Sequence, residues 1–373
     1  MRVKWILFGW LLSSICAACS PGAGWDDWTR YAERFVQADG RVIDLTFDQK
    51  STSEGQSYGL FFALVANDRP RFDAILNWTA LNLADGQLAT QLPGWLWGRR
   101  DDGSWGIKDT NSAADGDLWT AYALLEAGRL WKSPVYSALG RNLLDLAAQH
   151  EIADVGNDQY LLPAPLGFKL DDGRLRVDPS YVPPFQFRYF GTLDPKGPWM
   201  PILDTYQRRM PDMFRHGIAP DLVRVAPDGA IELDPERPTA SYDAIRVYLW
   251  AAMSGRDGVE QLPKLRGFVE IVRERKAPPE KIDVASGKPV AGDYSPIGFM
   301  AAALPYLQAV GEQPLADALR TRLKLARTKS QLMKNANYYD ESLVLFALGY
   351  LDGYYRFDDQ GRLLPRWAAP HQD

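Results

Sequence analysis

The chain has 373 residues, of which 46% are hydrophobic, so it can bury a large core in one domain or in two. Its formal net charge is −5 and its lysines and arginines are scattered, so nothing resembles the basic stripe of a nucleic-acid-binding protein. The three histidines are dispersed, no cysteine cluster exists, and no phosphate-binding or dinucleotide fingerprint is present. We therefore expect no metal, no cofactor and no nucleic acid, and carboxylates remain as the main reactive groups.

The first predicted element is an export signal. Arg2 and Lys4 precede an apolar stretch, residues 5–15, that is too short to span a bilayer in the mature protein. We therefore expect residues 1–20 to be a secretory signal peptide and residues 21–373 to be one mature domain without a membrane span. This pattern predicts a mature protein in a bacterial periplasm.

Both cysteines of the chain, Cys16 and Cys19, lie in this N-terminal segment, so the mature core is expected to contain no disulfide. An alternative is that Cys19 carries the lipid anchor of a lipoprotein. Cys16 stands where a lipoprotein signal usually has leucine, which argues against that alternative.

Hydrophobic periodicity predicts about twelve helices in the rest of the chain. They are expected near residues 24–38, 53–67, 69–84, 113–132, 133–150, 180–190, 196–214, 239–254, 259–276, 294–310, 313–327 and 338–354. Residues 90–108 and 221–235 are each predicted to form a β excursion with an Asp-Gly turn, and residues 155–178 to form a loop with a further Asp-Gly turn. No Ser- or Gly-rich linker divides the chain.

Alternate predicted helices differ in how apolar they are. The second, fourth, eighth, tenth and twelfth are apolar nearly all round, which predicts burial on every side, whereas neighbours such as residues 313–327 carry one leucine stripe and a charged remainder. This alternation predicts an all-α fold, an (α/α)6 barrel of six inner and six outer helices with short β-hairpin excursions. An α-solenoid is the rival, but it would show a repeat period and none is present.

Polar and acidic residues gather where the predicted inner helices begin. For any one of them, helix capping is the simplest interpretation. Ser51 and Glu54 have the spacing of a capping box, and Asp117, Asp340 and Glu341 are assigned mainly to capping.

Three acids stand out as a set, because inner helices of a barrel run parallel and open their N-termini on one face. Glu54, Asp115 and Asp243 would converge there, each fixed by the buried helix that follows it. Trp95 and Trp97 come before Asp115 in the chain and are expected to form the floor of a groove on which sugar rings stack. Carboxylates and tryptophans without metal or histidine are the residues typical of glycoside hydrolysis.

At these residues the sequence resembles glycoside hydrolase family 8. The segment AADGDLWTAYALLEAGRLW, residues 113–131, is similar to the family signature, and Ala114 and Thr120 are its two departures. The segment SEGQSYGL resembles the one that carries the family's catalytic acid, which maps onto Glu54. The segment SYDAIR resembles the one that carries the base, which maps onto Asp243.

The resemblance also implies a role for Asp115, which matches the acid that holds the sugar at the cleavage point. The expected substrate-binding residues are aromatic or cationic and lie on the first β stretch or where inner helices begin: Trp95, Trp97, Tyr181, Tyr242, Arg246 and Tyr338. Trp95 falls where the family has a stacking tryptophan, and Tyr242 and Arg246 fall where it has substrate contacts.

The resemblance implies an (α/α)6 fold and hydrolysis with inversion, with Glu54 as general acid and Asp243 as general base. Inversion requires the two carboxyls to stand roughly 6.5–9.5 Å apart, so that a water molecule fits between base and sugar. A helix N-terminus favours an ionised glutamate, so the pKa of Glu54 must be raised by burial and by the nearby Asp115.

Within the family, the compact chain is most similar to the periplasmic endo-β-1,4-glucanases of bacterial cellulose synthase systems. This implies a β-glucan polysaccharide as substrate, trimming of glucan during export, and a cellulose synthase complex as a partner. Hydrolysis of xylan, chitosan or mixed-linkage glucan is the alternative, followed by a polysaccharide lyase and a non-catalytic glucan-binding protein.

Overall fold

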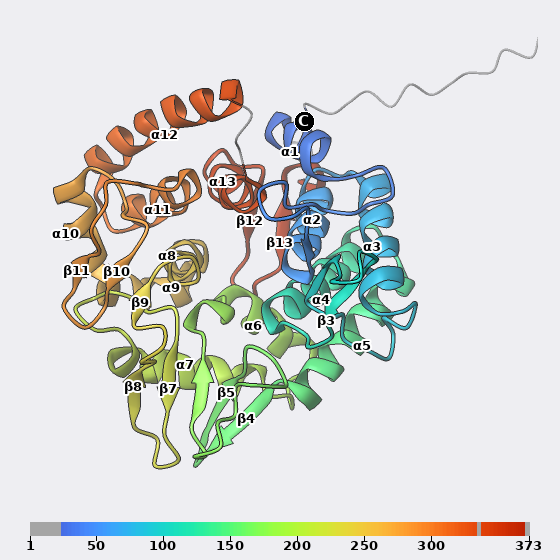
Figure 1. The fold of residues 1–373 in the computed structure, drawn as a ribbon, viewed down its shortest axis with the longest axis horizontal. Coiled ribbons are helices and arrows are strands. Elements are labelled where there is room, and N and C mark those ends of the chain that lie inside the picture. The colour runs from blue at the N-terminus through green and yellow to red at the C-terminus, as the bar shows by residue number, and fades with distance from the viewer. Residues whose placement is uncertain (1–23, 334–336, 370–373) are drawn as a thin grey trace, which may run out of the picture.

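Figure 1 looks down the ring of helices in the computed structural model, which describes residues 24–333 and 337–369. The inner helices are α2 (Ser53–Val65), α4 (Ala114–Leu130), α6 (Pro184–Leu193), α8 (Ala244–Met253), α11 (Ile297–Ala309) and α13 (Tyr338–Leu351). The outer helices are α1 (Asp26–Phe35), α3 (Arg69–Leu83), α5 (Pro134–His150), α7 (Trp199–Met213), α9 (Gly255–Gln261), α10 (Arg266–Arg275) and α12 (Gln313–Met333). The predicted (α/α)6 barrel is confirmed.

Burial separates the two rings as the apolar patterns predicted. In α2 every residue from Gly55 to Val65 is buried. In α12, Leu319 and Leu323 are buried on one stripe while Leu325 is exposed. A helix that is apolar all round needs neighbours on every side, and only the inner ring supplies them.

One predicted outer helix, residues 259–276, is wrong as a single element. The chain forms α9, then a 3-10 turn (Leu262–Leu265), then α10. Pro263 lies in that turn, and a proline in a helix interior removes a hydrogen-bond donor and clashes with the preceding turn. The outer position is therefore filled by two short helices.

The strands are short and form separate antiparallel sheets. They are β1 (Ser51–Thr52), β2 (Leu96–Arg99), β3 (Trp105–Asp109), β4 (Ile152–Val155), β5 (Asp158–Leu161), β6 (Leu175–Val177), β7 (Val223–Val225), β8 (Ile231–Leu233), β9 (Thr239–Ala240), β10 (Ile282–Asp283), β11 (Lys288–Pro289), β12 (Tyr355–Phe357) and β13 (Leu363–Pro365). Both predicted hairpins are present, as β2–β3 and β7–β8. The loop predicted at 155–178 is wrong, since it contains β5 and β6. The strand β6 pairs with the distant β7, and such a contact leaves no local signal.

Two of these sheets lie where inner helices begin. In the sheet β1-β2-β3, the strand β1 leads directly into α2, and in the sheet β11-β10-β9, the strand β9 lies just before α8. Their registers pair Ser51 with Trp97 and Ala240 with Ile282. These small sheets fix the starts of two inner helices, and the predicted acids lie at those starts.

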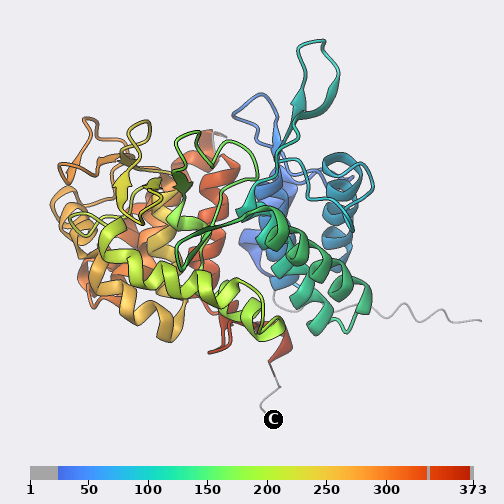
Figure 2. The ribbon, with the colours of Figure 1, turned by 90° about the horizontal axis from the view of Figure 1, so that it is seen from below.

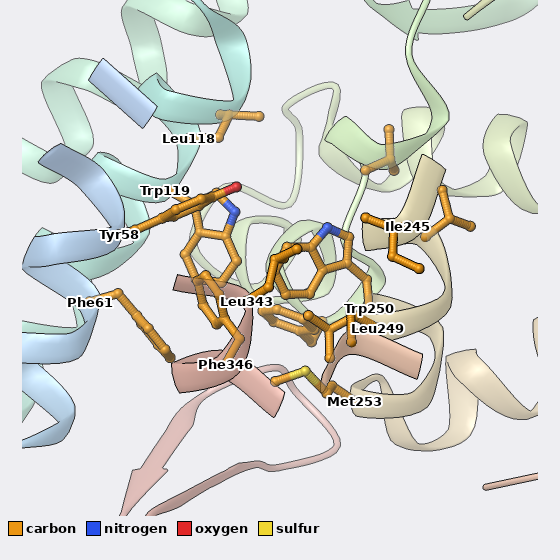
Figure 3. Close-up of a cluster of buried hydrophobic side chains, with 14 of the residues drawn as sticks. Tyr58, Phe61, Leu118, Trp119, Ile245, Leu249, Trp250, Met253, Leu343 and Phe346 are labelled. Atoms are coloured by element: carbon orange, nitrogen blue, oxygen red, sulfur yellow. The ribbon is translucent and has the colours of Figure 1, made fainter. Parts of the chain in front are cut away.

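Aromatic side chains fill the centre of the barrel (Figure 3). Trp119 of α4 contacts Trp250 of α8 with ring centroids 5.4 Å apart, and both pack on Phe346 of α13 at 5.0 and 5.1 Å. Tyr58 of α2 meets the same ring at 5.0 Å. Each fully buried aromatic side chain contributes about 1.5–3 kcal/mol, so this cluster is a strong anchor between helices far apart in sequence.

The predicted signal peptide, residues 1–20, with Cys16 and Cys19, lies outside the described residues. In the part of the chain that the structure describes, no helix combines the length and the apolar character needed to cross a membrane.

Candidate active site

Glu54 lies in the first turn of α2, close to the residue that caps the helix. The cap is Thr52, whose hydroxyl accepts a hydrogen bond from the backbone N–H of Gly55 at 3.0 Å. The predicted capping box of Ser51 and Glu54 is wrong, because Ser51 Oγ instead donates to the carbonyl of Val42 at 2.6 Å. The Glu54 carboxyl group is thus left to interact with side chains from other helices.

Asp115 occupies the first turn of α4, whose N-terminus touches that of α2. Its Oδ1 accepts a hydrogen bond from the Gly116 N–H at 2.8 Å. Gly116 is glycine for lack of space, since a Cβ there would lie 2.7 Å from Ser53 Oγ and 2.9 Å from the backbone nitrogen of Glu54. This close approach of two helix ends brings the Glu54 and Asp115 carboxyl groups to one place.

A buried cation, Arg246, joins the three predicted carboxylates. It lies in the first turn of α8 and is 1% exposed. Its Nη1 donates to Glu54 Oε1, and also to Asp115 Oδ2 at 2.9 Å. Its Nη2 donates to Asp243 Oδ1 at 2.9 Å and to Ser180 Oγ at 3.0 Å. The structure thus gathers Glu54, Asp115 and Asp243 around a single guanidinium group, which we call the carboxylate cluster.

The charges of the carboxylate cluster do not cancel. Three ionised carboxylates around one buried guanidinium would leave negative charge in a poorly solvated place. Burial raises the pKa of Glu54 to about 8, against the lowering effect of Arg246, and the charges of Asp115 and Asp243 raise this pKa further. Burial also raises the pKa of Asp115. Glu54 is therefore mostly protonated at neutral pH, even though a helix N-terminus favours its charged form.

Both carboxylate oxygens of Asp243 accept hydrogen bonds. Beside the bond within the carboxylate cluster, its Oδ2 accepts from Arg237 Nη2 at 2.6 Å. The start of α8 is capped by Asp221, whose Oδ1 accepts from the N–H groups of Ser241 at 2.7 Å and Ala244 at 3.0 Å. Since Asp221 does the capping, Asp243 is not needed for it, and its side chain stays 22% exposed.

Several residues at the carboxylate cluster were missed by sequence reasoning. Tyr58 OH donates to Glu54 Oε1 at 3.3 Å and lies 3.1 Å from Arg246 Nη1. The spacing of four residues between Glu54 and Tyr58 on one helix is a signal that could have found it. Asp221 and Arg237 carry no such signal, because neither belongs to a helix of the cluster and both reach it through the fold.

Two predicted substrate residues lie next to the carboxylate cluster. The ring of Tyr181 packs under Arg246, whose Cζ is 5.4 Å from the ring centroid. The carbonyl of Trp95 accepts a hydrogen bond from the N–H of Ser53 at 2.9 Å, so Trp95 stands beside the first turn of α2.

The other predicted substrate residues make contacts around this centre. Tyr242 precedes Asp243 in the chain, and its OH donates to Glu280 at 2.6 Å. Tyr338 is buried, and its OH shares a hydrogen bond of 3.3 Å with the hydroxyl that caps α2. Trp97 stacks on Trp105, so the structure places it in a separate aromatic group.

Asp340 and Glu341, two of the acids assigned to capping, make contacts with neighbouring helices. Asp340 Oδ1 accepts from the N–H of Gly298 at 2.9 Å, so it caps the neighbouring α11 rather than its own helix. Glu341 Oε2 accepts from Arg327 at 2.9 Å, an ion pair between α13 and α12. The capping assignment is therefore confirmed for Asp340, whose Oδ2 also accepts from Asn337 Nδ2 at the start of its own helix at 3.0 Å, and is wrong for Glu341, which pairs with another helix.

Asp117 is the third acid assigned to capping, and this assignment is also wrong. Its side chain and that of Glu151 are both fully buried, and the charge of Glu151 is one of the causes that raise the pKa of Asp117. Ser112 Oγ donates to Glu151 Oε1 at 2.6 Å. Burial raises the pKa of both acids, that of Glu151 to about 7. Burial and the neighbouring carboxyl group of Glu151 therefore favour the protonated form of Asp117.

We expect Asp117→Asn to be tolerated, whereas Asp117→Ala should destabilise the fold by about 1–3 kcal/mol. Asparagine keeps the size and polarity of a neutral Asp117 side chain, whereas alanine leaves a cavity in this fully buried place. Urea unfolding of both variants at pH 6 measures the difference. Equal losses of stability in the two variants would contradict a neutral Asp117 side chain in the fold.

The carboxylate cluster can both give and take a proton. Glu54 is a protonated acid, and Asp243 lies on the other terminal nitrogen of the same guanidinium group. Two carboxyl groups with separate tasks on either side of a bond are what glycosidic cleavage requires. Among the described residues, no group of histidine, cysteine and carboxylate side chains is arranged to hold a metal ion.

Comparisons with known proteins agree on one family. The family model described as Glycosyl hydrolases family 8 matches residues 3–353. An endoglucanase of Xanthomonas axonopodis pv. citri is 43% identical over 366 residues, covering 96% of this chain and 94% of the relative. An endoglucanase of Escherichia coli K12 is 40% identical over 366 residues, covering 95% and 94%. The crystal structure of an endo-1,4-D-glucanase from Vibrio fischeri ES114 superposes with a TM-score of 0.86 at 38% identity, covering 92% of this chain and all of that one.

Proposed function

Because the chain belongs to glycosyl hydrolases family 8, we propose that it hydrolyses internal β-1,4 bonds of a glucan with inversion at the anomeric carbon. The observation that carries this proposal is the carboxylate cluster, where Glu54 keeps its proton at neutral pH while Asp243 lies across Arg246. An endo-acting glucanase of this family needs an acid and a base in such a relation.

In the proposed mechanism Glu54 gives its proton to the glycosidic oxygen as the bond to the leaving sugar breaks. Asp243 takes a proton from a water molecule, whose oxygen attacks the anomeric carbon from the opposite face of the ring. Asp115 accepts hydrogen bonds from the sugar at the cleavage point, and its negative charge stabilises the positive charge that develops on the ring. Arg246 fixes the positions of all three carboxyl groups.

A β-1,4-glucan is the substrate best supported. The relatives named endoglucanase are 40–43% identical over nearly the whole chain, and the Vibrio fischeri protein is named an endo-1,4-D-glucanase. Tyr181 under Arg246 and Trp95 beside α2 offer aromatic surface for sugar rings next to the carboxyl groups.

We expect the purified protein to release reducing sugar from carboxymethyl cellulose and to lower the viscosity of the solution early, because internal cuts shorten chains quickly. Proton NMR of the first products should reveal the α-anomer, since inversion of a β bond produces it. A first product with the β-anomer would exclude inversion. Absorbance from an unsaturated sugar would identify a lyase, and no reaction would favour a glucan-binding protein.

For the cellular role, we propose that the enzyme acts in a bacterial periplasm and trims glucan chains during cellulose synthesis and export, beside a cellulose synthase complex. The supporting feature is the basic and apolar N-terminal sequence, typical of an export signal. Immunoblotting of cell fractions, and comparison of the cellulose made with and without the protein, test this role. A cytoplasmic protein, or cellulose unchanged by its loss, would contradict it.

A further inference from the structure

The hairpin β2–β3 projects beyond the body of the molecule, as Figure 2 shows in teal. Its first strand pairs with β1 in the register Ser51 with Trp97 and Thr52 with Leu96. The strand β1 continues without interruption into α2, which carries Glu54. The hairpin is therefore fixed to the element that holds the proposed acid.

Three tryptophans form a stack on one face of this hairpin. Trp97 and Trp105 are stacked with centroids 5.2 Å apart and 21° between their planes. Trp78 of α3 packs edge-on against Trp97 at 5.3 Å. Trp97 lies in the middle of the stack, while Trp105 is outermost and 44% exposed.

A buried arginine holds the tryptophan stack in place. Arg41 Cζ lies 4.1 Å from the ring centroid of Trp97 and 5.0 Å from that of Trp105. The guanidinium group is itself fixed, since Nε donates to Ser51 Oγ at 2.9 Å and Nη2 donates to the carbonyl of Gln49. Cation–π contacts restrain both rings. Trp105 therefore presents a rigid flat surface that loses little side-chain entropy when a ligand covers it.

The opposite face of the hairpin is occupied by cationic side chains. Successive residues of a strand point to opposite faces, so Gly98 and Gly106 lie on the face away from the tryptophans. Arg100 lies across Gly106, and the stems of Lys50 and Lys108 come within 3.2 and 3.3 Å of where a Cβ of Gly98 would be. Arg100, Lys50 and Lys108 thus lie on the face away from the tryptophans, whereas Arg41 lies against the tryptophan rings themselves.

A role in stabilising the hairpin does not explain why the outermost ring, that of Trp105, is exposed to solvent. A cross-strand aromatic pair stabilises a hairpin whether or not its outer face is exposed. A fixed aromatic ring matches the C–H face of a pyranose sugar in shape and in apolar character. Beside a site that cleaves glycans, the sugar chain itself is the ligand of matching chemistry.

We propose that Trp105 is a stacking platform that holds a β-glucan chain outside the cleavage site. This inference rests on the proposed function, because the ligand is the same polysaccharide. Trp105 pairs with Arg99 across the hairpin. Arg99 lies three residues from Leu96 along β2, so the strand places the two residues about 10 Å apart. The platform therefore acts only on chains that extend past the carboxylate cluster, and Trp105 determines chain-length preference without touching the reacting bond.

The test compares a polymer with a short oligosaccharide. For Trp105→Ala we expect the KM for carboxymethyl cellulose to rise about three- to tenfold, with kcat unchanged. For cellotetraose we expect both constants to match those of the wild type. Binding of the Glu54→Gln and Glu54→Gln/Trp105→Ala variants to insoluble cellulose, measured by depletion, tests the platform without turnover and should differ by a similar factor.

Matched variants separate stacking from folding. Trp105→Phe keeps a flat ring and should keep most of the polymer affinity, whereas Trp105→Leu keeps apolar bulk against Trp97 and should lose as much as alanine. Leu364→Ala removes another exposed apolar side chain, on β13, which Figure 2 shows away from the hairpin, and should change nothing.

Wild-type KM and cellulose binding in both Trp105→Ala and Trp105→Leu would overturn the platform. So would an equal loss on polymer and tetrasaccharide, because that pattern indicates a general structural effect. Failure of the proposed function is a separate result, in which the wild-type protein itself releases no reducing sugar from either substrate.

Discussion

Glu54→Gln should lower kcat on soluble β-1,4-glucan by about 10²–10⁴-fold. Glutamine has the same shape and can still accept the hydrogen bond from Arg246, but it has no proton to give to the leaving oxygen. KM should change little, because the substrate contacts remain. Initial rates of reducing-sugar release measure the effect, and the Leu364→Ala variant is a control for surface substitution. Near wild-type turnover would remove Glu54 from the mechanism.

The same variant should alter how stability depends on pH. Burial raises the pKa of Glu54 from 4.5 to about 8. The folded protein then holds a proton that the unfolded chain releases, so the wild type loses stability as pH rises from about 4.5 to 8. Glutamine does not titrate, so Tm should fall less between pH 5 and pH 8.5 in the variant. An identical fall in both proteins would mean that the carboxyl group is ionised in the fold.

The fold was predictable because burial leaves a direct trace in the sequence. A helix such as α2, buried from Gly55 to Val65, requires apolar or small residues on every side, and the outer α12 requires them only on the stripe of Leu319 and Leu323. The alternation of the two patterns is enough to infer two rings. The strand β6 could not be found in this way, since its pairing with β7 joins residues nearly 50 positions apart.

The three acids of the candidate site were predictable, but the hydrogen bonds that join them to Arg246 were not. Glu54, Asp115 and Asp243 stood out because each precedes a buried helix, and the structure gathers them. The central position of Arg246 was not foreseen from its spacing, because its contacts to α2 and α4 depend on how the helices are placed in the ring.

Local capping rules failed where tertiary partners compete for the same side chain. Ser51 fits a capping box in sequence, yet its hydroxyl is used by Val42 and Arg41. Asp117 stands in a first turn, yet it is fully buried beside Glu151. In both cases the competing partner lies on another segment, so the residues near each acid or hydroxyl could not reveal it.

Arg246→Met is expected to destabilise the protein by about 3–5 kcal/mol at neutral pH and to abolish measurable turnover. Methionine fills similar space but leaves Glu54, Asp115 and Asp243 without the cation that they share. Uncompensated carboxylates in a buried place must either remain charged at a cost or take up protons. The loss of stability should therefore be smaller at pH 5 than at pH 7, because protonation removes the unpaired charges. Urea unfolding at the two pH values measures it.

A double variant separates the effect of the Arg246 charge from the effect of its packing. If the destabilisation comes from like charges around a missing cation, Asp115→Asn should restore part of the stability lost in Arg246→Met, because it removes one negative charge, whereas Glu54→Gln should restore little, because Glu54 already holds a proton. Residues in contact are expected to be non-additive, with a coupling of about 0.5–3 kcal/mol. Arg246→Lys, which keeps one charge but cannot bridge three carboxyl groups, should fall between methionine and the wild type. Strict additivity of Arg246→Met and Asp115→Asn, together with an equal loss at both pH values, would show that Arg246 acts by packing and not by its charge.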